Sequence, residues 1–342
     1  MTTIKDIARK AHVSIATVSN VLNEKGTVKP ETAQRVRAAA IALRYSKNIS
    51  AEELAQGRRN MVGLIISDIK NPFFPDVTKG FQDLAFANGM DALVLNTAYD
   101  PHRTLTSVRR LISLRVPGVA ILTSEIDRSV VGLLVEGKIA SVYLDHGEIG
   151  PWTSIIKVDY AGGIESAVAH LRSLGHERIG FIGGPRQLKS ARVRKDAFLE
   201  VVQDESLVID SDFRFEGGYV ACAELLRRVQ PSAVVAANDL MAIGAMRYAQ
   251  DIDMRLPDEL SIVGFDNVSF TEFTRPTLTT VSLPRERLGA MAFTALENLW
   301  QRDGVGKQFE LETRLVIRGS TGRTRLSGAL LASPTTRLQS KW

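Results

Sequence analysis

Short, uncharged side chains follow one another between Val13 and Asn23, in the segment VSIATVSNVLN. Alanine and isoleucine can contact the methyl group of thymine, asparagine can pair with both hydrogen-bonding groups of adenine, and serine and threonine can reach phosphates. The major groove of DNA admits one helix, and a helix that lies flat in it needs side chains this short. The segment therefore predicts a helix that contacts base edges. A small solvated helix of a structural bundle is the alternative.

The segment is expected to form the second of three helices, and the other two should hold it in place. The first should begin at Ile4, behind a capping-box pattern. The second is capped by Ser14 and should end near Leu22. The third should begin near Pro30, a residue suited to the first turn, and end near Arg44–Tyr45. The apolar side of the second helix should face the other two helices through Val18, Val21 and Leu22.

The net charge of +5 is distributed unevenly along the chain. Residues 1–60 contain 11 Lys and Arg against five Asp and Glu, whereas residues 61–318 contain 28 against 33. The last 24 residues contain four basic residues and no acidic one. A small basic head on a mildly acidic body indicates that the head binds a polyanion.

Composition excludes several classes of protein. Of the 342 residues, 44% are hydrophobic and 24% are charged, as in ordinary globular proteins, and Cys222 is the only cysteine. We therefore expect neither a disulfide nor a cysteine-based metal site, and no cofactor. The amino-terminal segment has no secretory apolar region, and no apolar run reaches the roughly 18 residues of a membrane span. A cytoplasmic protein that contacts no membrane is expected.

An enzyme is not expected. The chain has five histidines and no convincing pairing of a nucleophile with a base. The segment GGP at 183–185 lacks the lysine and the spacing of a phosphate-binding loop. A solute-binding protein without a regulatory role on DNA is the alternative to a DNA-binding regulator.

The body alternates short apolar runs with helical stretches. Strands are expected at MVGLIIS, DALVLN, GVAILT and ASVYLD, and in a second series at IIKVD, RIGFIG, AVVAAND and LSIVGFD. Helices are expected between them, for example over 77–88 and 162–173. This alternation predicts an α/β fold with two doubly wound parallel-sheet lobes and a boundary near 155. Ligands of such folds bind at the carboxyl ends of the strands, here between the lobes.

The chain resembles the LacI/GalR family of bacterial repressors along most of its length. The head carries the specific pattern IKDIA…VSxxTVSxVLN. The body carries weaker markers in the family order: NPFFPDVTKGFQDLA, VDYAGG, LGHERIGFIGGP, RVRKDAF, AANDLMAIGAM, VGFDN and LTTVSLP. The resemblance implies a helix-turn-helix headpiece over 1–46, a hinge over 47–60 and an effector-binding and dimerisation core of the periplasmic-binding-protein type over 61–320. In this core the lobes are expected to be joined by crossing strands near 280–290.

The resemblance also implies which head residues contact operator DNA. Ile15, Ala16 and Asn20 match the positions that select the sequence, and Thr17 and Ser19 match those that position the backbone. The remaining predicted DNA contacts are Ser14, Asn23, Lys29, Asn48, Leu54 and Arg58. In the hinge, Leu54 matches a leucine that enters the minor groove and kinks the DNA, and Asn48 matches the start of the hinge helix. Lys47, Glu52 and Glu53 depart from the family pattern.

Effector contacts follow from the same resemblance and from the chemistry of hydroxyl recognition. Arg194 and Asp266 match the family residues that bind ligand hydroxyls, and Asn238 ends a strand beside them. Phe73 and Phe74 could stack on a ligand or pack a loop. Asp145 and Phe213 occupy matching but looser positions. A carbohydrate effector is implied.

Lys157 is a further candidate effector contact. It shares a strand face with Asp159, and together with Arg194 it would suit an anionic effector such as a sugar acid. A salt bridge with Asp159 or an exposed lysine is the interpretation that we favour.

The resemblance implies a homodimer, which presents two heads to a near-palindromic operator. The segment 321–342 contains Gly328, Pro334 and no sustained heptad, so we expect a disordered tail rather than a tetramerisation helix. Allosteric repression is implied, with an effector that either releases or tightens the DNA complex, since both occur in the family.

Overall fold

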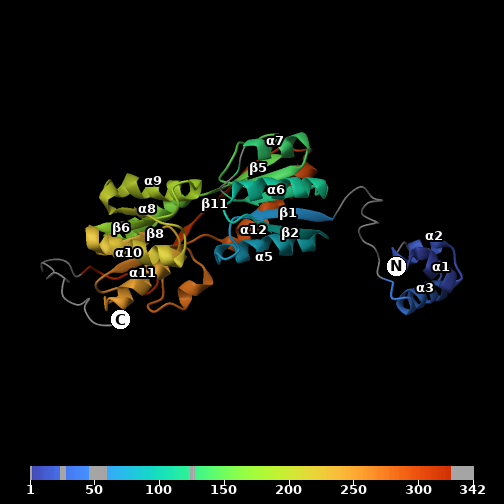
Figure 1. Ribbon diagram of the computed structural model, residues 1–342, viewed down its shortest axis with the longest axis horizontal. Coiled ribbons are helices and arrows are strands. Elements are labelled where there is room, and N and C mark those ends of the chain that lie inside the picture. Colours follow the sequence, from blue (N-terminus) through green and yellow to red (C-terminus); the bar gives the residue numbers. More distant parts are fainter. Residues whose placement is uncertain (1, 24–27, 46–59, 124–125, 127, 325–342) are drawn as a thin grey trace. The chain divides into compact units, whose positions relative to one another are not determined.

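The computed structural model describes residues 2–23, 28–45, 60–123, 126 and 128–324. They belong to two compact units, which are residues 1–59 and residues 60–342 (Figure 1). Each unit is described by itself below. Asn48, Leu54 and Arg58, which we predict to contact DNA, lie outside the described residues.

The first unit has three described helices around a small apolar core. They are α1 (Ile4–Ala11), α2 (Ile15–Leu22) and α3 (Pro30–Ala42). Ile7, Val18, Val21 and Val36 are buried where the helices meet. The Ser14 hydroxyl accepts a hydrogen bond from the Thr17 backbone N–H at 3.1 Å, which is the N-cap that the sequence predicts. The side of α2 opposite Val18 and Val21 is left for solvent or a ligand.

The first lobe of the second unit is built on a parallel sheet of six strands, in the order β11-β5-β4-β3-β1-β2. Its strands are β1 (Met61–Ile66), β2 (Asp91–Asn96), β3 (Gly118–Leu122), β4 (Ala140–Leu144), β5 (Thr153–Val158) and β11 (Gln308–Leu311). Helices α5 (Phe73–Ala87) and α12 (Arg285–Gln301) share one apolar core with this sheet, whereas α6 (Pro101–Ser113) and α7 (Arg128–Glu136) share another.

The second lobe repeats this order of strands as β12-β10-β9-β8-β6-β7, with only β12 antiparallel. Its strands are β6 (Ile179–Gly183), β7 (Val208–Asp210), β8 (Ala233–Ala236), β9 (Ser261–Asp266), β10 (Thr279–Ser282) and β12 (Arg314–Val316). Its helices are α8 (Tyr160–Ser173), α9 (Lys189–Val202), α10 (Phe215–Arg228) and α11 (Asp239–Asp251), with short 3-10 turns η1 (Glu205–Leu207) and η2 (Ser269–Glu272).

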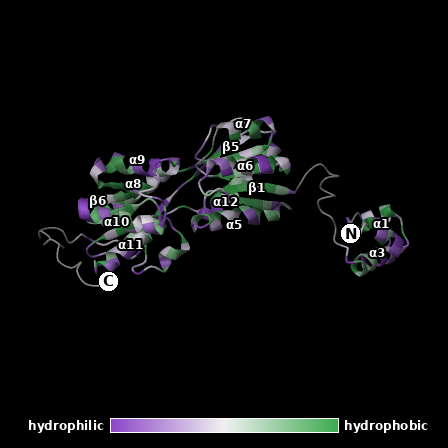
Figure 2. Cartoon of the chain, viewed as in Figure 1, coloured by the Kyte–Doolittle hydropathy of each residue, from purple (hydrophilic) through white to green (hydrophobic). Residues whose placement is uncertain are grey.

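Hydrophobic residues concentrate in the strands of both lobes (Figure 2). All five residues of β3 and all six of β9 are buried, as expected for parallel strands covered by helices on both faces. The predicted fold class, two doubly wound lobes behind a helical head, is confirmed. In the part of the chain that the structure describes, no helix is both long and apolar enough to span a membrane.

The boundary between the lobes differs from the prediction. We expected IIKVD to open the second series of strands, but it lies in β5, which pairs with β4 and β11 in the first lobe. The chain therefore enters the second lobe after Val158, at α8. It returns to the first lobe between β10 and α12, and crosses again between β11 and β12.

The predicted tail over 321–342 begins too early. Thr324 N–H donates to the Leu174 carbonyl at 3.0 Å, and the Gly322 carbonyl lies 3.0 Å from Nε2 of His176. Residues 321–324 are thus held on the second lobe, because β12 leads directly into this contact with the end of α8. The rest of the predicted tail lies outside the described residues.

Two glycines allow α5 and α12 to pack unusually closely. A Cβ atom on Gly80 would lie 2.0 Å from the Glu286 carbonyl oxygen, and one on Gly289 would lie 1.9 Å from the Val77 carbonyl oxygen. Both obstacles are backbone atoms, so a side chain at either position would force the helices apart. The two helices therefore form one rigid layer on the first lobe.

Replacing Gly80 with alanine should lower the free energy of unfolding by about 1–3 kcal/mol, because the added methyl group overpacks this contact. Gly132→Ala in α7 is the matched control. Apart from its two neighbours in the chain and the backbone of its own helix, no atom of the described residues lies within 4 Å of the place that its methyl group would take, so alanine there should stabilise slightly through helix propensity. Chemical denaturation of both variants measures the difference. A Gly80→Ala variant as stable as Gly132→Ala would contradict the close packing.

Candidate functional site

One candidate surface is the exposed side of α2 in the first unit. Ile15 is 49% exposed and Ala16 is also exposed, while Thr17, Ser19 and Asn20 are partly exposed. Asn23 caps the carboxyl end of the helix, and its Nδ2 lies 3.4 Å from the Ser19 hydroxyl. The structure thus brings the predicted base-contacting side chains together on one face, opposite the buried valines.

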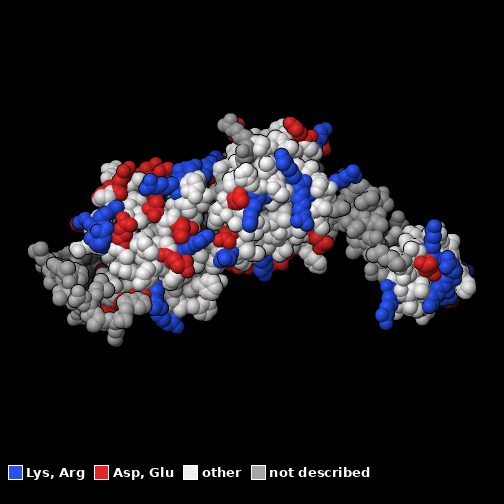
Figure 3. Space-filling view, in the orientation of Figure 1, with Lys and Arg blue, Asp and Glu red and all other residues white. Residues whose placement is uncertain are grey.

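Basic residues outnumber acidic ones in the unit that carries this face. The described part of the first unit contains seven Lys and Arg against Asp6 and Glu31, and blue side chains outnumber red ones on the view of this unit in Figure 3. Lys29, a predicted DNA contact, is exposed directly before α3. An excess of positive charge on a unit with one uncharged helix face suits binding to the phosphates of DNA next to a base-reading helix.

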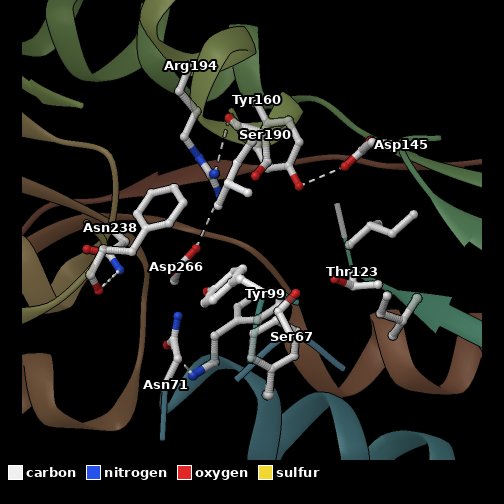
Figure 4. Close-up of a pocket in the computed structure, with 16 residues that line it drawn as sticks. Ser67, Asn71, Tyr99, Thr123, Asp145, Tyr160, Ser190, Arg194, Asn238 and Asp266 are labelled. Atoms are coloured by element: carbon white, nitrogen blue, oxygen red, sulfur yellow. Dashed lines mark hydrogen bonds and ion pairs between the residues drawn. The ribbon is translucent and has the colours of Figure 1, made fainter. Parts of the chain in front are cut away.

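The second candidate site is a pocket between the two lobes of the core (Figure 4). Several of its polar side chains directly follow parallel strands: Ser67 after β1, Thr123 after β3 and Asp145 after β4 in the first lobe. Asp266, at the end of β9, and Arg194, on α9, enter from the second lobe. The pocket therefore lies at the carboxyl ends of both sheets, where doubly wound folds bind ligands.

Arg194 and Asp266 form a buried ion pair in this pocket. Their side chains are 7% and 6% exposed, and Nη2 of Arg194 lies 3.6 Å from Oδ1 of Asp266. The guanidinium carbon lies 4.2 Å from the centre of the Tyr160 ring and 4.6 Å from that of Phe265. Nε of Arg194 has no hydrogen-bond partner among the residues that the structure describes. The pair is thus fixed by packing, while part of its hydrogen-bonding capacity is unused.

Asp145 orients the opposite side of the pocket. Its Oδ1 accepts the Val158 backbone N–H at 2.9 Å, and its Oδ2 accepts the Tyr160 hydroxyl at 2.8 Å. Burial raises the pKa of the Asp145 carboxyl, although these hydrogen bonds and the charges of Arg194 and Lys189 oppose the shift. Tyr160 thus touches two of the three charged groups of the pocket, the Asp145 carboxylate through its hydroxyl and the Arg194 guanidinium through its ring.

Asn238 and Phe213 are tied together at the edge of the pocket. Nδ2 of Asn238 donates to the Phe213 carbonyl at 2.9 Å, and its Oδ1 caps α11 by accepting the Met241 N–H at 3.0 Å. Asn238, and not the next residue Asp239, is therefore the cap of this helix. Asp239 instead accepts the Val268 N–H at 2.7 Å and the Thr280 hydroxyl at 2.6 Å.

Phe73 and Phe74 line the pocket from the first turn of α5, with ring centres 5.1 Å apart and planes at 89°. We expected the two phenylalanines in a loop and the helix from residue 77. Pro75 lies within the first turn, where proline is tolerated, so the helix starts earlier. Both rings are largely buried and offer their remaining surface to the pocket.

Lys157, which we predicted as an effector contact, does not line the pocket. It is exposed on β5, opposite Glu310 of β11 in the parallel register. Alternation along the strand turns Lys157 away from the buried residues on either side of it.

Sequence reasoning missed nine residues that line the pocket. They are Ser67, Asn71, Tyr99, Leu122, Thr123, Leu144, Tyr160, Leu188 and Ser190. Most lie within a few residues of a strand end or a helix start, and this position was the signal that could have found them. In the described part of the chain no cluster of His, Cys, Asp and Glu could hold a metal ion.

The pH dependence of stability should report on Asp266. Burial raises the pKa of its carboxyl to about 6, while Arg194 and Arg285 lower it. Because the folded pKa lies above the unfolded value, the folded state holds more protons, and this group's contribution to stability is lost as pH rises through 6. Asp266→Asn should therefore gain about 1 kcal/mol relative to the wild type between pH 5 and pH 7.5. Urea denaturation across this range measures the gain, and a constant difference would contradict it.

Comparison with known proteins agrees with both parts of the structure. Residues 3–48 match the family model "Bacterial regulatory proteins, lacI family", and residues 168–321 match the model of a periplasmic binding protein-like domain. The transcriptional repressor PurR of Mannheimia succiniciproducens is 31% identical over 329 residues, which cover 94% of this chain and 98% of that protein. The transcriptional regulator DegA of Bacillus subtilis is 33% identical over 333 residues, with coverage of 94% and 98%.

Solved structures give the same result. The lac repressor dimer bound to operator and the anti-inducer ONPF is 27% identical, with a TM-score of 0.82 over 94% of this chain and 99% of that one. A complex of the regulator CelR with cellobiose is 27% identical, with a TM-score of 0.67 and coverage of 94% and 100%. A LacI-family regulator from Enterococcus faecium with bound ribose is 27% identical, with a TM-score of 0.69 and coverage of 78% and 100%.

Fold and sites together define a DNA-binding regulator with a ligand-binding core, and not an enzyme. The chain belongs to the LacI family of bacterial transcriptional regulators.

Proposed function

We propose that this protein is an allosteric repressor whose operator affinity is set by a neutral carbohydrate bound between the lobes. The observation that carries the proposal is the pair of Arg194 and Asp266. Their nearest charged atoms are 3.6 Å apart, and Nε of Arg194 has no partner among the described residues. Adjacent ligand hydroxyls could therefore accept from the guanidinium and donate to the carboxylate. This is the chemistry of a vicinal diol.

The charges that line the pocket favour a neutral ligand over an anionic one. The pocket contains two carboxyls, Asp145 and Asp266, and one guanidinium, Arg194. With both carboxyls ionised, a sugar acid would meet net negative charge in a largely desolvated space, which costs binding energy. Since Lys157 does not line the pocket, the argument for an anionic effector loses its second cation.

Aromatic rings supply the apolar part of such a site. Phe73, Phe74 and Phe213 line the pocket together with leucines from both lobes. Sugar rings have apolar faces that pack on aromatic rings while their hydroxyls meet polar side chains. Relatives crystallised with ribose and with cellobiose support a carbohydrate for this chain. A nucleoside has the same combination of a planar ring and a diol and belongs in the same test.

A homodimer completes the proposal, because two copies of α2 are needed to read a near-palindromic operator. Support comes from the lac repressor dimer bound to its operator, to which this chain is similar. The core also exposes Phe86 on α5, and Phe270 and Phe273 in and after η2, and large apolar side chains are costly to leave in water. Light scattering at micromolar concentration should give the mass of two chains.

Calorimetric titration of the full-length protein tests the effector. Ribose, cellobiose, gluconate and adenosine form the panel, and each binder is then added to the protein with a duplex enriched from a genomic oligonucleotide pool. We expect a neutral sugar or the nucleoside to bind and to change operator affinity, in either direction, by about 5- to 150-fold. Binding of gluconate alone would overturn the neutral-ligand proposal. A protein that enriches no duplex would favour a solute-binding protein without a role on DNA.

A further inference from the structure

Arg285, the first residue of α12, connects the two lobes of the core. Its Nε donates to Oδ2 of Asp76 at 2.8 Å, and its Nη2 lies 2.7 Å from the same oxygen. Its Nη1 donates to the main-chain carbonyl of Asp266 at 2.5 Å and to that of Asn267. Asp76 lies on α5 of the first lobe, whereas Asp266 and Asn267 lie at the end of β9 in the second. One guanidinium, 13% exposed, therefore holds both lobes.

The backbone of Arg285 is held in the first lobe, because α12 packs closely on α5. Four residues further along α12, Gly289 packs against the Val77 carbonyl of α5, and Gly80 of α5 packs against the Glu286 carbonyl. Through these close backbone contacts the two helices interlock and move as one layer of the first lobe. Any rotation of the second lobe relative to the first must therefore stretch or break the hydrogen bonds from Arg285 to the second lobe.

The turn that Arg285 holds is an unfavourable one. Asp266 has φ of +108° and Asn267 has φ of +56°, in a region that residues with a Cβ atom rarely adopt. Such a conformation persists only where its surroundings hold it. Arg318 and Ser282 hold the Asn267 side chain from within the second lobe. Arg285 holds the two carbonyls, and it does so from the first lobe.

This turn also directs a side chain of the pocket. The Asp266 carboxylate, on the same residue whose carbonyl accepts from Arg285, faces Arg194 (Figure 4). At the other end of the contact, Asp76 lies one turn after Phe73 on α5, and Phe73 lines the pocket from the first lobe. Ligand-facing groups of both lobes are therefore joined through a single side chain that does not itself line the pocket.

We propose that Arg285 is a positioning residue, which holds the lobes in the arrangement seen here and keeps the Asp266 carboxylate directed into the pocket. The proposal rests on the proposed function, since it concerns the same pocket. A ligand that changes the angle between the lobes must change the contacts of Arg285. This guanidinium is then a link through which occupancy of the pocket reaches α5, beside the contact between Tyr160 and Asp145 that also joins the lobes.

The distance between the lobes tests this proposal without a ligand. Spin labels are attached to cysteines at Thr106 on α6 and Glu200 on α9, both exposed positions, while the native Cys222 is buried. Pulsed electron resonance on the full-length protein, in which labelled chains are mixed with an excess of unlabelled chains so that pairs within one chain dominate, should give one main distance. In Arg285→Ala, we expect a second distance in roughly a tenth of the molecules or more, because a minor arrangement of the lobes gains population. Asp76→Asn should shift the distribution in the same direction.

Three comparisons separate a positioning role from a merely structural one. Arg287→Ala, an exposed arginine of the same helix, should leave the distance unchanged. The double variant Asp76→Asn with Arg285→Ala should give the same distance distribution as Arg285→Ala alone. Arg285→Lys, which keeps the charge beside Asp76, should restore part of the wild-type distribution. If Arg285→Ala fails to fold, Asp76→Asn decides alone.

Unchanged distributions in the folded variants would overturn the assignment of Arg285. This outcome is separate from the failure of the proposed function, because the measurement needs neither effector nor operator. Conversely, if none of ribose, cellobiose and adenosine binds, the distance measurement still decides whether Arg285 positions the lobes.

Discussion

Arg194→Ala is expected to destabilise the core by about 3–5 kcal/mol, because it leaves Asp266 as a buried charge without its partner. The Asp266 side chain is 6% exposed, and the lost guanidinium fills the space between the Tyr160 and Phe265 rings. The variant therefore loses both ion-pair compensation and packing. Urea denaturation at pH 7.5 measures the change. Arg192→Ala, an exposed arginine on the same helix, should cost less than about 0.5 kcal/mol.

The double variant Arg194→Ala with Asp266→Asn separates stability from binding. An asparagine at 266 removes the uncompensated charge, so part of the lost stability should return. Binding of the carbohydrate should stay lost, since neither the guanidinium nor the carboxylate is available to the ligand hydroxyls. If Arg194→Ala is as stable as Arg192→Ala, the pair is not the electrostatic centre of the pocket. If the double variant binds as the wild type does, the pair is not the ligand site.

The strands and helices were largely predictable because their signals are local. Short apolar runs bounded by polar residues marked the strands, and Ser14 and Pro30 marked helix starts. Which of the two sheets a strand joins depends on residues far from it in the sequence. The run IIKV is apolar enough to begin either lobe, and only its pairing with β4 and β11 places it in the first. The helix predicted over 77–88 begins earlier, at Phe73, because Pro75 lies in the first turn, where proline is tolerated.

The pocket was partly predictable from the family resemblance. Seven predicted effector contacts line it: Phe73, Phe74, Asp145, Arg194, Phe213, Asn238 and Asp266. Tyr160 was missed because its role depends on three-dimensional contacts with Asp145 and Arg194, which lie far from it in the sequence. Of the two interpretations of Lys157, the structure agrees with the exposed lysine that we favoured and not with the effector contact, because a charge on a strand can lie on the exposed face as easily as on the buried one. Spacing fixes which residues share a face, but tertiary packing fixes which face is buried.

Ala16→Glu should lower operator affinity on the order of 100-fold or more while leaving the fold intact. Ala16 is exposed in the first turn of α2, on the face that we propose contacts the bases. A carboxylate there would approach the negative charge of the DNA, and like charges brought together in an interface cost several kcal/mol. The same carboxylate stabilises the amino-terminal end of an isolated helix. Fluorescence anisotropy with the duplex that the wild type enriches measures the affinity.

Ala16→Glu should weaken operator binding but stabilise the head. These opposite effects distinguish the loss of a DNA contact from unfolding. A variant that lost affinity by unfolding would lower the thermal stability of the head, whereas Ala16→Glu should keep or raise it. Ala38→Glu changes the net charge by the same amount at an exposed position of α3, so it corrects for the general loss of attraction to DNA. We expect this control to lose less than about tenfold in affinity. If both variants lose affinity equally, only the overall charge of the head matters. The exposed side of α2 would then not be the surface that reads the bases.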